Sequence, residues 1–68
     1  MNRVHYNITG LSNAQVKTQL KNVLSEMDGV SMVNIDLGRG SVEVGYKDPA
    51  DEYKIMQSIE HVGCRIEG

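Results

Sequence analysis

The feature that most constrains the fold of this chain is the order in which its hydrophobic periodicity changes. Val4, Tyr6 and Ile8 alternate with polar residues, which is typical of a strand that is buried on one face. Gly10 ends this alternation. The next apolar residues recur at the spacing of one helical face and are Val16, Leu20, Val23, Leu24 and Met27. The sequence up to Gly29 therefore predicts a strand and then a helix, with Gly29 as a left-handed stop.

The second half of the chain repeats this change of period. Apolar and polar residues alternate on both sides of Gly38-Arg39-Gly40, which predicts a β-hairpin over residues 31–46. Asp48-Pro49 then predicts the start of a second helix, with the aspartate as N-cap and the proline at the first helical position. The apolar face of this helix consists of Ile55, Met56, Ile59 and Val62. Gly63 ends it, and residues 64–67 alternate as a last edge strand would.

The predicted order is β-α-β-β-α-β. Four strands with one polar face and two amphipathic helices predict a two-layer α+β sandwich, in which a four-stranded antiparallel sheet carries both helices on one face. The 68 residues are enough for one domain, so we expect a single domain over 1–68. A hydrophobic content of 40% with 24% charged residues suits a folded chain rather than a disordered one.

Charge and cysteine content exclude several classes of function. The formal charge is −2, and the seven basic residues are scattered, so we expect no nucleic-acid partner and no binding to an anionic membrane. No apolar run approaches the roughly 20 residues of a membrane span, and the N-terminus has no signal-peptide core. The single Cys64 excludes an internal disulfide and a cysteine-rich zinc site. The expected location is the cytoplasm.

At this point the sequence resembles the heavy-metal-associated (copper-chaperone-like) domain family. The similarity covers nearly the whole chain, and the segments that carry it are the end of the first strand at 10–12 and the segments 27–30, 33–44 and 59–64. The resemblance implies the ferredoxin-like version of the predicted sandwich. It also implies Cu(I) or Zn as a candidate metal and a protein partner or a metal-transport ATPase as a candidate partner, since family members carry soft metals or form domains of metal-pumping ATPases.

The chain departs from the family at the motif Gly-Met-(Thr/Ser)-Cys-x-x-Cys. Here that stretch reads Gly10-Leu11-Ser12-Asn13-Ala14-Gln15-Val16, so Asn13 and Val16 stand where the family has its two cysteines. Cu(I) prefers a pair of soft thiolates, and neither an amide oxygen nor an isopropyl group replaces one. The loop instead predicts a helix start, with Ser12 and Gln15 as a capping box and Leu11 packing on Val16 as a hydrophobic staple.

Three residues remain as candidate metal ligands. Cys64 begins the last strand, beside the metal loop in the family, where it is a ligand, a bridge between two chains, or a small core residue. His61 falls in the last turn of the second helix, where an imidazolium is favourable without any metal. Asn13 is a weak oxygen ligand, an anion-binding residue or simply a solvated one.

The leading functional hypothesis is a protein-interaction module that binds metal weakly or not at all. The alternative is a metal-binding or metal-transport protein with a rewired site at Cys64, within one chain or across a dimer. Monomer and weak homodimer both stay open. An enzyme is not expected, because no nucleophile–base–orienter set is present. An RNA-binding module of this topology needs aromatic residues on the open sheet face, whereas Tyr6 and Tyr46 have the parity of core residues.

Overall fold

A computed structural model describes residues 2–10 and 14–67 of the chain. These residues form four strands and two helices in the predicted order. The elements are β1 (Asn2–Thr9), α1 (Ala14–Ser25), β2 (Val30–Asp36), β3 (Ser41–Tyr46), α2 (Glu52–Val62) and β4 (Arg65–Ile66). Within the described part of the chain, neither helix is long and apolar enough to cross a membrane.

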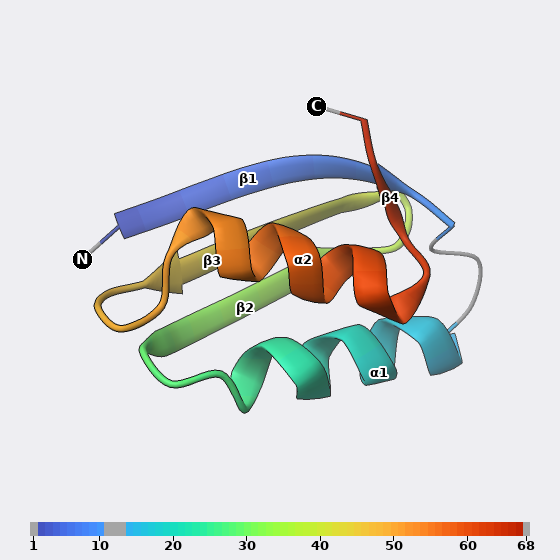
Figure 1. Cartoon of the computed structure of the whole chain (residues 1–68). Coiled ribbons are helices and arrows are strands. Elements are labelled where there is room, and N and C mark those ends of the chain that lie inside the picture. The colour runs from blue at the N-terminus through green and yellow to red at the C-terminus, as the bar shows by residue number, and fades with distance from the viewer. Residues whose placement is uncertain (1, 11–13, 68) are drawn as a thin grey trace.

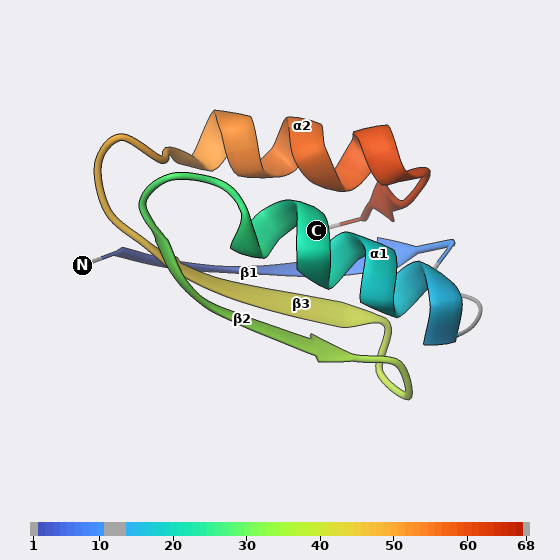
Figure 2. The same cartoon turned by 90° about the horizontal axis from the view of Figure 1, so that it is seen from below.

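The sheet has the strand order β2-β3-β1-β4, and all neighbours run antiparallel. Figure 2 shows both helices on one face of this sheet, while the other face is left open. The predicted ferredoxin-like, two-layer α+β sandwich is therefore confirmed. The last edge strand is confirmed as well, because Ile66 pairs with Ile8 and Arg65 pairs with Thr9.

The core lies between the two layers and consists mainly of residues that the periodicity predicted. The exceptions are Ala50, which is buried without a periodic signal, and Leu37, which the alternation placed on the core face but which is 36% exposed. Leu20 and Leu24 of α1 and Ile55 and Ile59 of α2 are fully buried, as are the inward-facing Val42 and Val44 of β3. Tyr6 and Ile8 of β1 join them from the same face of the sheet. The apolar side chains of the strands and those of the two helical faces therefore pack against each other in one core, which removes their apolar surface from water.

The end of α1 differs from the prediction. Gly29 has a φ of 95°, which confirms the left-handed conformation, but the last residue of α1 is Ser25. Residues 26–29 form turns, and the amide of Val30 donates to the carbonyl of Met27 at 3.1 Å. The predicted capping box and staple rest in part on Leu11 and Ser12, which lie outside the described residues.

The predicted start of α2 is wrong by three residues. The N-cap is Asp51, whose backbone is extended and whose Oδ1 accepts a hydrogen bond from the amide of Lys54 at 2.7 Å. Asp48 and Pro49, joined by a cis peptide bond, belong to the turn before the helix. There the amide of Ala50 donates to the carbonyl of Lys47 at 2.9 Å. Asp51, not Asp48, therefore lies within reach of the free amides of the first helical turn.

Candidate functional site

The end of β1 and the start of β4 meet where the family has its metal loop. Gly10 has a φ of 89°, and a Cβ placed on it would lie 3.1 Å from the carbonyl oxygen of Gly63 and 3.5 Å from the Cα of Cys64. The chain entering the loop thus runs directly against the segment that carries Cys64. This is the side of the molecule where the sequence placed a candidate site, although Asn13 itself lies outside the described residues.

Cys64 is held by the C-terminal cap of α2. Gly63 adopts a left-handed conformation with φ 108°, and its amide donates to the carbonyl of Glu60 at 3.0 Å. The amide of Cys64 donates to the carbonyl of Ile59 at 3.3 Å. This double cap is the Schellman arrangement that glycine favours after a helix. It fixes the direction in which the chain turns from α2 into β4, and with it the position of the Cys64 side chain.

The Cys64 side chain points into the core rather than into solvent. Cys64 is only 3% exposed and forms part of the buried cluster. Desolvation by this burial raises the pKa of the Cys64 thiol above its ordinary value. Soft metals bind the thiolate rather than the thiol, so a raised pKa works against metal binding at Cys64. The interpretation of Cys64 as a small core residue fits these observations.

His61 occupies a different environment. It lies in the last turn of α2 as predicted, is exposed, and lines the groove between the two helices. Its imidazole is thus at the surface while the thiol of Cys64 is enclosed. Among the described residues, no group of three or more His, Cys, Asp and Glu side chains is arranged to hold a metal ion.

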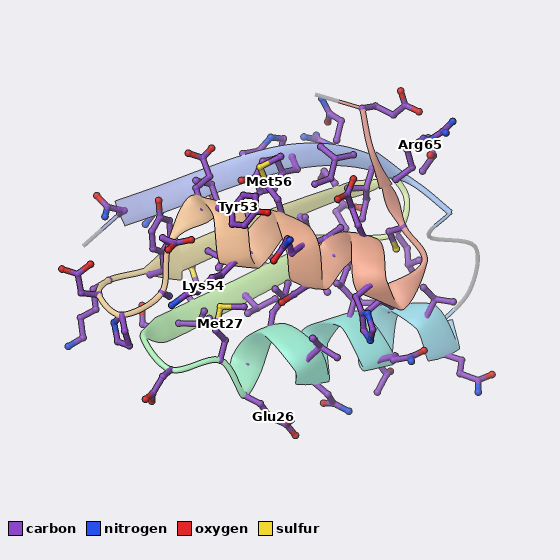
Figure 3. The ribbon with its side chains drawn as sticks, in the orientation of Figure 1. Glu26, Met27, Tyr53, Lys54, Met56 and Arg65 are labelled. Atoms are coloured by element: carbon purple, nitrogen blue, oxygen red, sulfur yellow. The ribbon has the colours of Figure 1, made fainter. Side chains whose placement is uncertain are left out.

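The groove between α1 and α2 was not predicted from the sequence. It has a volume of about 740 Å³, with Val23 and Met27 from one side and mostly polar residues of α2 from the other. Figure 3 shows Met27 and Lys54 next to each other at one end of it. The helical spacing placed Val23 and Met27 on the apolar face of α1, but the sequence did not indicate that both would be only partly buried.

The outer face of the sheet is polar, as the alternation predicted. Arg3 and His5 of β1 are exposed there, and Arg3 lies 3.9 Å from Glu43 of β3. Tyr6 and Tyr46 are buried on the inner face, so their predicted parity is confirmed. The hydroxyl of Tyr6 donates to Glu52 Oε1 at 3.3 Å. The open face therefore carries neither of the two tyrosines that lie in the sheet.

Comparison with solved structures finds the same fold over nearly the whole chain. The structure described as CsoZ metallochaperone has a TM-score of 0.94 and 30% sequence identity, and the match covers 98% of this chain and 97% of that chain. CopZ metallochaperone has a TM-score of 0.91 and 25% identity, with 97% and 100% of the two chains covered. A copper binding domain from HMA7, a P-type ATPase, matches with a TM-score of 0.88 at 21% identity over 100% and 96%, a likeness of fold alone.

Comparison with protein-family models gives no match, and comparison with curated protein sequences gives none either. The fold and the structural matches nevertheless define the class, a small ferredoxin-like domain of the metallochaperone type. The chain belongs to the heavy-metal-associated, copper-chaperone-like domain family. Unlike the family motif, which has two cysteines, this chain has a single cysteine, Cys64. Asn13 and Val16 stand at the positions that correspond to the two cysteines of the motif.

Proposed function

We propose that this chain is a non-enzymatic protein-interaction module of the heavy-metal-associated fold that binds Cu(I) weakly or not at all. The observation that carries this proposal is the condition of its one thiol. Cys64 is buried, and desolvation raises the pKa of its thiol. The two thiolates of the family motif thus have no substitute at the surface of the described chain.

The chemistry of the remaining candidate ligands supports the same proposal. Asn13 offers a neutral oxygen, His61 an exposed imidazole, and Cys64 a protonated thiol inside the core. Cu(I) prefers soft sulfur ligands, and a structural zinc site needs about four ligands in tetrahedral geometry. Binding through Cys64 would require the thiol to lose its proton and to leave its apolar surroundings, and both steps cost free energy.

The nature of the relatives suggests the partner. The compared structures are described as metallochaperones and as a copper binding domain from a P-type ATPase. We therefore propose a protein of metal handling as the partner, with a metal-transport ATPase or a metallochaperone as the first choice. In this proposal the module acts in the cytoplasm as a monomer or weak homodimer, without nucleic acid, membrane or catalytic chemistry.

A metal competition experiment tests the proposal. The reduced protein is titrated with Cu(I) against bathocuproine disulfonate, and with Zn(II) against a colorimetric chelator. We expect both chelators to retain their metal, because the chain offers no pair of exposed soft ligands. Tight one-to-one binding by the monomer would contradict the proposal.

The same titration distinguishes the alternative, a rewired site at Cys64. That site would bind metal as a monomer with His61 or as a dimer bridged by two copies of Cys64. Cys64→Ser would abolish metal binding or metal-dependent dimerisation, and His61→Ala would weaken only the monomeric form. Under the proposed function both variants behave as the parent chain does.

A further inference from the structure

The edge of the sheet at β2 carries backbone groups that no described strand pairs. Within residues 2–10 and 14–67, β2 is the outermost strand and pairs only with β3. β4, the strand nearest the C-terminus, lies at the opposite edge beside β1. In Figure 1, β1 and α1 lie on opposite sides of β2, and α1 packs against β2. The free edge of β2 is therefore bordered on the helix side by α1.

The hydrogen bonds of β3 show which of its residues bond to β2. The amide of Ile8 in β1 donates to the carbonyl of Gly40 at 2.7 Å, so Gly40 directs its carbonyl to β1. Successive residues of an antiparallel strand direct their backbone groups to opposite sides. Ser41 and Glu43 therefore direct their backbone groups to β2.

The partners of these two residues fix the direction of the groups in β2. Asp36 lies opposite Ser41 and Asn34 lies opposite Glu43, so both face β3. Val33 and Ile35 alternate with them, and their amides and carbonyls face the free edge. The bulge of β2 lies before Val33, so this part of the ladder is regular and an added strand would extend it.

Two lysines of α1 lie on the same side as this edge. Val23 lines the groove with α2 and so marks the side of α1 that faces α2. At helical spacing, Lys17 and Lys21 lie about 120° and about 160° from Val23 round the helix axis. The fully buried Leu20 lies between Val23 and Lys17. Lys17 and Lys21 are therefore on the side of α1 away from α2, beside the free edge of β2.

The charge of these two lysines is not compensated in the described chain. α1 contains no acidic residue, and among residues 2–10 and 14–67 neither Lys17 nor Lys21 forms an ion pair. Glu26, the next carboxylate along the chain, lies about 140° from Lys21 at helical spacing. Asp36 of the edge strand accepts the amide of Arg39 at 3.1 Å and lies 3.9 Å from its Nε. The helix side of the free edge is therefore positive.

The spacing of the two lysines fits alternate residues of a strand. Four residues of a helix rise by about 6 Å, and alternate residues of an extended strand lie about 6.8 Å apart. A strand added to β2 directs every second side chain to the helix side. Two carboxylates placed two residues apart on that strand would therefore meet Lys17 and Lys21, while its backbone pairs with Val33 and Ile35.

We propose that the free edge of β2 binds an extended acidic segment of a partner protein, antiparallel to β2, with carboxylates at alternate positions facing Lys17 and Lys21. This inference rests on the proposed function, because it names the surface through which the module acts. A second copy is less suitable. Pairing of two β2 strands about a two-fold axis would place the lysines of both α1 helices on one side of the joined sheet, where like charges repel.

Peptide titrations monitored by NMR test the proposal on the metal-free ¹⁵N-labelled chain. The probes are blocked eight-residue peptides in which threonine alternates with glutamate or with lysine. We expect the threonine–glutamate peptide to shift the amide signals of Val33 and Ile35 and to slow their hydrogen exchange. The threonine–lysine peptide should bind about fivefold more weakly or worse, because two charged pairs change sign.

Methylated peptides test the backbone pairing separately from charge. Val33 and Ile35 direct their side chains to the core, and residues that form a hydrogen-bonded pair share one face of the sheet. The glutamates on the helix side therefore supply the backbone donors. A threonine–glutamate peptide with N-methylated glutamates should lose binding. The same peptide with N-methylated threonines, whose amides face away from β2, should keep it.

Matched variants locate the site. Lys17→Glu with Lys21→Glu should reverse the preference between the two peptides, and Lys17→Gln with Lys21→Gln should remove it. Lys54→Glu with Arg65→Glu makes the same charge change on exposed residues of α2 and β4. This control should alter neither affinity by more than about twofold, because these residues lie away from the edge and are screened by solvent.

Three outcomes overturn the proposal. These are no shifts with the threonine–glutamate peptide, equal binding of both peptides, or shifts centred on β1 or on the groove between the helices. Shifts of β2 that grow with protein concentration in the absence of peptide would assign the edge to a second copy instead. No metal enters this experiment, so its failure leaves the result of the Cu(I) titration, and the interaction module that the titration tests, unaffected.

Discussion

Gly29 lies where the turn after α1 contacts the turn before α2. Its carbonyl accepts a hydrogen bond from the amide of Lys47 at 2.9 Å, and its φ is 95°. A Cβ at this position would collide with the carbonyl oxygen of Lys47 and lie 2.8 Å from the amide nitrogen of Ala50. We expect Gly29→Ala to lower the free energy of unfolding by about 3 kcal/mol, from backbone strain and the clash together. Urea denaturation measures this loss.

Gly63 provides the matched control for Gly29. Its φ of 108° is also left-handed, but a Cβ there would meet nothing within 4 Å. Gly63→Ala should therefore cost only the conformational penalty of about 1 kcal/mol. Equal losses for the two variants would show that the close approach at Gly29 contributes nothing.

Ionisation of Tyr6 should lower the free energy of unfolding of the domain as the pH rises in the alkaline range. Burial, and then the nearby Glu52 carboxylate, raise the pKa of Tyr6 to about 12 from an ordinary value of 10.0. The folded chain thus retains a proton that the unfolded chain loses, so the stabilisation is complete below pH 10 and is lost as pH rises toward 12. We expect a loss of about 2 kcal/mol across this window.

Urea denaturation at several pH values between 9 and 12, on the parent chain and on Tyr6→Phe, checks this dependence. The phenylalanine variant should lose less stability over the same range. Cys64 acts in the same direction, because burial also raises the pKa of its thiol, so the comparison is best made in a Cys64→Ala background. Parallel curves for the two chains would contradict the assignment to Tyr6.

Among the elements, α2 offers a direct test of which aspartate begins the helix. Asp51 Oδ1 accepts the amide of Lys54 at 2.7 Å, whereas Asp48 lies in the turn before the helix. Asp51→Ala should lower the free energy of unfolding by about 1 kcal/mol, the usual contribution of an N-cap. Asp48→Ala, with the same loss of charge, should cost clearly less. A larger loss at Asp48 would restore the start that the sequence predicted.

The two helices also show why sequence predicts elements better than their ends. Two aspartates precede α2 within four residues, and Asp48-Pro49 has the pattern of both a helix start and a turn. Only the observed hydrogen bond at Asp51 separates these possibilities. For α1, Met27 continues the helical spacing of apolar residues beyond Ser25, because a turn can keep an apolar side chain against the core after the helical hydrogen bonds have ended.

On the scale of the whole molecule, the two layers were predictable from the sequence, whereas the extent of the last strand and the direction of Cys64 were not. Alternation and helical spacing fix which side chains face the core, and burial of these side chains requires one arrangement of sheet and helices. The extent of β4 was not predictable in this way, because Arg65–Ile66 is too short a strand for periodicity to define. The inward direction of Cys64 likewise depends on the cap at Gly63, which the sequence indicated only as the end of a helix.

Restoring the two cysteines of the family motif tests whether the fold of this molecule can be kept while a metal site is lost or gained. In a Cys64→Ser background, Asn13→Cys with Val16→Cys rebuilds the cysteine spacing of the family motif. Val16 is a partly buried residue at the margin of the core, so its replacement should cost about 1 kcal/mol of stability and leave the fold intact. We expect this variant to take Cu(I) from a chelator that retains its metal in the presence of the parent chain. The reason is that two thiolates replace two side chains that do not bind Cu(I).

The matched control for this restoration is Asn13→Ala with Val16→Ala in the same background, which changes both positions without adding sulfur. It should bind no more Cu(I) than the parent chain in the chelator competition. The variant with the two cysteines could also fail to bind Cu(I) while its circular dichroism spectrum remains that of the parent. In that case the absence of metal binding has a cause besides the missing ligands. The surroundings of the loop, including the close approach of Gly10 to Gly63 and Cys64, would then have diverged from a metal-binding arrangement too.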